Sequence, residues 1–167
     1  MVSLVRLTQP KGTEQKEDIM MNQIFEETYA KDTAILASYH AADQAEDLAG
    51  IEKARAEHDA LLERIREEGS DFEMLYGLYC RAREIGNALI DIREPHEYND
   101  AAKLIASLRK YGIEEFTFSS GWSSAIESAW EFTQQGCKLE GLVEVNDRIK
   151  SFGRKDYDKR HALLFRV

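Results

Sequence analysis

Apolar side chains recur every three or four residues through most of the first half of the chain, with charged residues between them. This is the spacing of amphipathic helices that bury one stripe. The pattern predicts three helices, separated by breaks at Gly50 and Gly69. Because no helix of this kind is stable alone, we expect them to pack as an antiparallel bundle or hairpin. The third should end at Glu94, since the residue before Pro95 is forced out of helical conformation.

The pattern changes after Pro95 to shorter segments that alternate between helical and strand periodicity. A helix is predicted from Asn99 or Asp100, closed by Gly112. The segments after it are predicted as strand, helix, strand and strand, over 115–118, 123–135, 137–146 and 163–167. We expect the strand-helix-strand part to form a right-handed parallel crossover, while the last strand could pair in either direction.

The predicted fold class is α+β, with an N-terminal antiparallel helical bundle or hairpin followed by a small α-β-α-β-β subdomain. Residues 1–18 have no periodicity and are expected to be a flexible lead-in. The acidic helical region then covers 19–93, and the small α/β subdomain covers 94–167.

The net charge of −9 lies entirely in the first half of the chain. Residues 1–92 hold 10 Lys/Arg and 19 Asp/Glu, whereas residues 93–167 hold 12 of each. Repulsion from the acidic half argues against sequence-independent nucleic-acid binding by the whole protein and favours a protein partner with a basic surface. The candidate acidic surface is on the second helix and comprises Glu57, Asp59, Glu63, Glu67 and Glu68. No apolar run approaches the roughly 20 residues of a membrane span, so no membrane association is expected.

A Ser/Gly loop lies between the predicted strand 115–118 and the helix after it. Such a loop presents backbone N–H groups at the positive end of a helix and is a candidate contact for a ligand or partner. Its candidate residues are Ser119, Ser120, Gly121, Trp122 and Ser123. A structural interpretation competes with this one, because Ser124 and Glu127 have the spacing of a capping box. The loop lacks a GxSxG motif, and we assign no catalytic residue.

Five aromatic residues surround this loop: Phe116, Phe118, Trp122, Trp130 and Phe132. We expect them to pack in the core. An exposed Trp122 at the strand end would instead mark a binding surface, because tryptophan is enriched at the centres of protein interfaces.

A basic tract near the end of the chain is a possible nucleic-acid contact, since it interleaves cations with Phe152 and Tyr157. Its cations are Arg148, Lys150, Arg154, Lys155, Lys159 and Arg160. A solvated connection between strands is the alternative interpretation. The four histidines are scattered without ligand spacing, so we predict no metal and no cofactor.

The segments FTFSSGWSSAIESAWEF and GCKLEGLVEVN, with the ending HALLFRV, resemble an uncharacterised family of small proteins carried on bacterial mobile genetic elements. The resemblance covers residues 95–167 well and the acidic half more loosely. It implies phage, plasmid or conjugative-element cargo in a bacterial cytoplasm. Small acidic proteins of that setting are often inhibitors of host defence, including anti-CRISPR proteins. This resemblance carries over no catalytic residues.

Three hypotheses for the function follow. The first is a non-enzymatic, anti-CRISPR-like interaction protein whose acidic helices bind a basic groove of a defence nuclease. The second is a small-molecule or nucleotide-binding domain that uses the 119–124 loop. The third is a DNA-associated protein that uses the basic 148–160 tract.

Overall fold

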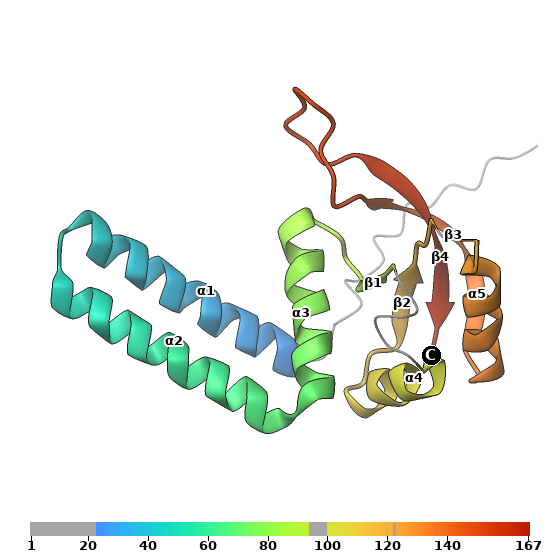
Figure 1. Ribbon diagram of the computed structural model, residues 1–167, viewed down its shortest axis with the longest axis horizontal. Helices are drawn as coiled ribbons and strands as arrows, with labels where there is room; N and C mark the ends of the chain where they lie inside the picture. Colours follow the sequence, from blue (N-terminus) through green and yellow to red (C-terminus); the bar gives the residue numbers. More distant parts are fainter. Residues whose placement is uncertain (1–22, 94–99, 122) are drawn as a thin grey trace, which may run out of the picture.

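The computed structural model describes residues 23–93, 100–121 and 123–167 (Figure 1). In these ranges the chain forms five helices and a four-stranded mixed sheet, with the long helices first. The predicted α+β class is therefore confirmed. The expected lead-in over 1–18 lies outside the described residues.

Helices α1 (Gln23–Gln44) and α2 (Leu48–Glu68) form an antiparallel hairpin that projects to one side of the molecule (Figure 1). Gly50 was predicted to separate them, but it lies in the first turn of α2. The chain turns just before it, where Glu46 has a positive φ of 54°. Helix α3 (Ser70–Ile85) follows the predicted break at Gly69, whose φ is 102°, and crosses the base of the hairpin (Figure 1).

Helix α3 ends at Ile85, so the prediction that it reaches Glu94 was wrong. Gly86 adopts a left-handed conformation with φ 75°, which glycine reaches without steric cost. The N–H of Asn87 then donates to the carbonyl of Ala82 at 2.8 Å, the closing bond of a Schellman cap. The helix ends ten residues before Pro95, and the segment that follows supplies strand β1 (Asp91–Ile92), which the sequence pattern had not indicated.

The second half contains α4 (Ala101–Lys110), β2 (Glu115–Phe118), α5 (Ala125–Gln134), β3 (Lys138–Asn146) and β4 (Lys159–Arg166). The strand order is β1-β2-β4-β3, with β1 parallel to β2 and β4 antiparallel to both of its neighbours. Strands β2 and β3 run in the same direction, as the predicted crossover requires, but they are not adjacent. Because β4 pairs with β3 as a hairpin, it enters the sheet between them.

The core is one continuous cluster of buried side chains that joins the helices to the sheet. On the sheet, the ring of Phe132 from α5 lies 5.3 Å from that of Phe116 and 5.5 Å from that of Phe165. At the base of the hairpin, Phe25 of α1 stacks on Phe72 of α3 at 5.0 Å. The predicted apolar stripes are thus buried near the base of the hairpin and along α3, whereas Leu36 of the α1 stripe is exposed.

Strands β3 and β4 continue beyond the end of β2 as a two-stranded ribbon, in which 143–146 pair with 159–162 (Figure 1). Strand β4 therefore begins four residues before the predicted start at Leu163. The ribbon, with its connecting loop 147–158, bends toward the C-terminal end of α3 (Figure 1). Lower down, β3 carries a bulge at Glu140, the extra residue between Leu139 and Gly141, which pair with successive residues of β4.

Candidate functional surfaces

The predicted loop begins with a serine that is not at the surface. Ser119 is only 4% exposed, and its hydroxyl donates to Oδ2 of Asp91 at 2.7 Å. Thr117 donates to Oδ1 of the same carboxylate at 2.9 Å. The side chains of Thr117 in β2 and of Ser119 just after it therefore bind the adjacent strand β1, and Ser119 has a structural role.

A chain of charges continues from Asp91 to the base of the ribbon. Arg93 donates from Nε to Asp91 at 3.0 Å and from Nη1 to Asp147 at 2.6 Å. On the far side, Asp147 lies 3.8 Å from Nη1 of Arg160 at the start of β4. We call Asp91, Arg93, Asp147 and Arg160 the charge cluster. It ties the ribbon to the end of strand β1.

The pKa of the Asp147 carboxyl is lowered by this environment. Burial alone would raise that pKa, but the hydrogen bond from Arg93 and the backbone N–H of Arg148 outweigh it, together with the charges of Arg93 and Arg160. The carboxylate is consequently held in its charged form, as its position between two guanidinium groups requires.

The rest of the loop is more open. Ser120 is half-buried, whereas Gly121 and Ser123 are exposed; Trp122 lies outside the described residues. The predicted capping box is wrong, because the Ser124 side chain makes no cap hydrogen bond at the start of α5. Gly121 and Ser123 are exposed, so a ligand or partner contact at this loop stays a prediction. The hydroxyl of Ser119 takes no part in it, because it is bound to Asp91.

Two large apolar residues of α5 face solvent, contrary to the expectation that Trp130 packs in the core. Trp130 is 64% exposed, and Ile126, one turn before it, is 81% exposed. The helix buries a single stripe through Ser128 and Phe132, and at 100° per residue positions 126 and 130 lie on the opposite side. Phe116, Phe118 and Phe132 are buried as predicted.

All five predicted acidic residues of α2 are exposed, but they lie on two different sides of the helix. Asp59, Glu63 and Glu67 are four residues apart and form a row opposite the buried Leu61 and Ile65. The other two, Glu57 and Glu68, line hollows between α1 and α2.

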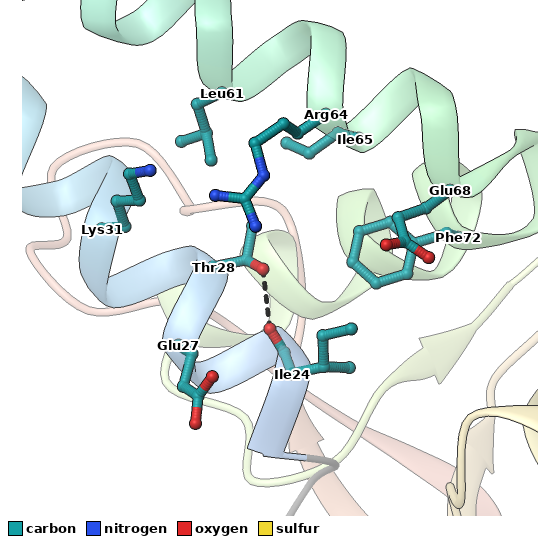
Figure 2. Close-up of a pocket in the computed structure, with 9 residues that line it drawn as sticks. All are labelled: Ile24, Glu27, Thr28, Lys31, Leu61, Arg64, Ile65, Glu68 and Phe72. Carbon is teal, nitrogen blue, oxygen red and sulfur yellow. Dashed lines mark hydrogen bonds between the residues drawn. The ribbon is translucent and has the colours of Figure 1, made fainter.

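Figure 2 shows the hollow at the base of the hairpin, a pocket of about 190 Å³ with Leu61, Ile65 and Phe72 among its lining residues. Its lining also includes Glu27 and Glu68 together with Lys31 and Arg64. The second hollow, nearer the tip, is lined by small residues with Asp47, Lys53 and Glu57.

Three of the five cations of residues 23–68, namely Lys31, Lys53 and Arg64, therefore lie in these hollows. The opposite side of α2 has the acidic row together with the other two cations of the helix, Arg55 and Arg66, and Arg66 pairs with Glu63 at 3.3 Å.

The predicted basic tract occupies the ribbon and its loop. Lys159 and Arg160 lie in β4, where Lys159 donates to Asn146 and Arg160 approaches Asp147. Lys150, Arg154 and Lys155 are exposed in the loop, while Arg148 is half-buried. The tract is thus divided into two cations engaged at the base of the ribbon and a group nearer its end.

The charge cluster was not predicted from the sequence, because residues 91–93 were assigned to a helix. The signal was the alternation Ile90-Asp91-Ile92-Arg93, in which apolar and charged residues follow a period of two, as in a strand. Both isoleucines are fully buried in the structure.

Neither a metal site nor a membrane-spanning helix is found in the described ranges. There, no group of three or more His, Cys, Asp or Glu residues is placed to hold a metal ion. No helix within those ranges combines the length and the apolar character needed to cross a bilayer.

Comparison with known families decides the relationship of the second half of the chain. A model for a domain of unknown function (DUF7698) matches residues 74–167. The chain belongs to the DUF7698 family. No curated protein and no solved structure matches it. The DUF7698 match begins within α3 and includes the sheet, the charge cluster and the ribbon, whereas the hairpin lies outside the matched residues.

Proposed function

We propose that the protein is a non-enzymatic interaction protein whose acidic hairpin binds a basic surface of a protein partner. The observation that carries this proposal is the charge of the projecting hairpin. Residues 23–68 hold twelve acidic and five basic side chains, and three of the cations line the hollows between the helices. Outside the hollows, α2 carries four acidic residues, Glu52, Asp59, Glu63 and Glu67, against the two cations Arg55 and Arg66, so this side of the helix has a net charge of −2.

The row Asp59, Glu63 and Glu67 is the centre of the proposed contact. These residues stand on the part of α2 whose other side is anchored by the buried Leu61 and Ile65, so their backbone is firmly held. Exposed carboxylates at one-turn intervals attract a basic surface and raise the rate of association, and salt screens this attraction over about 8 Å. The nucleic-acid channel of a bacterial defence nuclease is the partner surface that we propose.

The test is a binding and inhibition assay on purified bacterial defence nucleases, with the triple variant Asp59→Asn, Glu63→Gln, Glu67→Gln. Loss of three charge contacts of up to about 1 kcal/mol each should weaken binding by roughly tenfold or more. Wild-type affinity should also fall steeply between about 50 and 300 mM salt.

The matched control neutralises three exposed glutamates of the second half, Glu114, Glu127 and Glu131, and should leave binding unchanged. Equal losses in the two triple variants, or an affinity independent of salt, would contradict the proposal.

The alternative of a nucleotide site at the 119–124 loop has less support. Ser119 is buried and donates to Asp91, and the chain has no phosphate-binding motif at the loop.

A further inference from the structure

The loop 147–158 at the end of the ribbon is held in shape by its own hydrogen bonds. The N–H of Asp147 donates to the carbonyl of Asp158 at 2.6 Å, and the N–H of Asp158 donates to the carbonyl of Ile149 at 3.0 Å. Between them, the N–H of Arg154 donates to the carbonyl of Ser151 at 3.0 Å across a turn. The loop therefore presents its other side chains from a defined backbone.

The most exposed large apolar side chain of the described residues lies in this turn. Phe152 is fully exposed, and Ile149 is 65% exposed. Gly153, with φ 80°, follows Phe152 directly and turns the chain back toward β4. A phenyl ring is thereby placed at the far end of the ribbon with no contact to the core.

Three exposed cations stand within three positions of this ring: Lys150, Arg154 and Lys155. Lys150 is held over the ring of Tyr157 at 4.3 Å, and Arg154 lies 3.8 Å from Asp158. The remaining strand cations, Lys159 and Arg160, are engaged at the base of the ribbon. The end of the ribbon thus combines one free aromatic face with three cations, which exceed the two carboxylates of 149–158, the exposed Asp156 and the half-buried Asp158.

We propose that this end of the ribbon binds single-stranded nucleic acid. Phe152 stacks on an unpaired base, while Lys150, Arg154 and Lys155 contact the phosphates on either side. Every base has a face that can stack on an aromatic ring, so the contact is sequence-tolerant. This proposal adds a second surface, on the DUF7698 part of the chain, to the acidic hairpin and does not depend on it.

The acidic hairpin does not prevent this contact. Its charges lie on separate elements, α1 and α2, and the tip of the hairpin stands apart from the end of the ribbon (Figure 1). Screening reduces their repulsion beyond about 8 Å at physiological salt.

A lipid surface would also attract cations and a phenyl ring, but the apolar area is too small for it. A single myristoyl chain gives only marginal membrane binding, with an association constant of about 10⁴ M⁻¹. Phe152 and Ile149 together offer less apolar surface than such a chain. Stacking on a base needs only the one ring.

The experiment measures binding of fluorescein-labelled oligothymidylate to the full chain by fluorescence anisotropy at about 50 mM salt. Phe152→Ala should weaken binding by about five- to hundredfold, the usual effect of losing one stacked base. Lys150→Gln with Lys155→Gln should lower the slope of log affinity against log salt by about 1.4. Leu142→Ala is the matched control, because it removes an exposed apolar side chain in β3, away from the loop, and should bind as wild type does.

Three results would overturn the proposal. The first is no binding of the oligonucleotide by the wild type. The second is equal affinity of Phe152→Ala and Leu142→Ala. The third is Phe152-dependent binding to vesicles of anionic lipid without binding to the oligonucleotide. The acidic-row variant Asp59→Asn, Glu63→Gln, Glu67→Gln should retain oligonucleotide binding, which separates this proposal from that for the hairpin.

Discussion

At the scale of single residues, the carboxylate of Asp91 accepts hydrogen bonds on both of its oxygens. Its donors are Thr117 in β2, Ser119 just after β2, and Arg93 just after β1. The guanidinium group of Arg93 donates hydrogen bonds from Nε and Nη1, but its Nη2 is buried without a hydrogen-bond partner. Removing one partner of such a cluster leaves the other charge uncompensated, so the cluster is costly to break.

Replacing Asp147 by Asn tests the charge cluster through the pH dependence of stability. The folded pKa of Asp147 is lowered, so its carboxylate stabilises the fold above the unfolded pKa of about 3.9. That stabilisation is lost as the pH falls through the folded pKa. We expect Asp147→Asn to lower the free energy of unfolding by about 2 kcal/mol at pH 7, with a smaller difference from wild type near pH 2.

Urea unfolding at both pH values measures this difference, and Glu114→Gln at an exposed site is the control. A difference that stays constant between pH 7 and pH 2 would show that the charge of Asp147 does not stabilise the ribbon.

At the scale of elements, the sequence predicts the helices and strands that have a periodic apolar stripe. It misses the helix end and the short strand that depend on the backbone conformation of a few residues. The helix was predicted to continue through Gly86, because Gly86 and Leu89 keep the helical spacing of the apolar stripe. In the structure Gly86 is the cap, and the next segment is extended. The start of β4 was missed because Lys159, Arg160 and His161 are polar, as expected in a ribbon that leaves the sheet.

Substituting the two glycines of the α3 region separates a cap from a helix interior. Gly86→Ala places a Cβ at φ 75° and 3.3 Å from Nδ2 of Asn146, so we expect a loss of about 1–2 kcal/mol. Gly77→Ala lies inside α3 with nothing within 4 Å of the added Cβ, and should gain about 0.5–1 kcal/mol. Urea midpoints measure both changes. The same sign for the two variants would contradict the assigned cap.

At the scale of the whole molecule, burial in the hairpin decreases with distance from the sheet. Phe25, Leu61 and Ile65 near its base belong to the core, whereas the tip half of α2 buries only Ala54. The exposure of Phe152 and Trp130 likewise follows from the packing of whole elements. A sequence shows that a residue is aromatic, but only the fold decides whether anything covers it.

Native-state hydrogen exchange tests this gradient of burial. Amides over 38–54 should open locally and exchange at least tenfold faster than those over 61–66 and in α3, because few buried contacts hold the tip. Exchange of the base should approach the rate of global unfolding. Uniform protection along both helices would contradict this picture and indicate that the tip is stabilised by contacts not accounted for by burial.

The bulge at Glu140 has a consequence for how the molecule behaves among its own copies. Strand β3 is an edge of the sheet and exposes Leu139 and Leu142, a combination that invites a neighbouring chain to add a strand. The extra residue lies between these leucines and disturbs the regular spacing of N–H and C=O groups along the edge. A strand added by another copy of the chain would lose its register at the bulge. The bulge therefore opposes edge-to-edge aggregation of the protein.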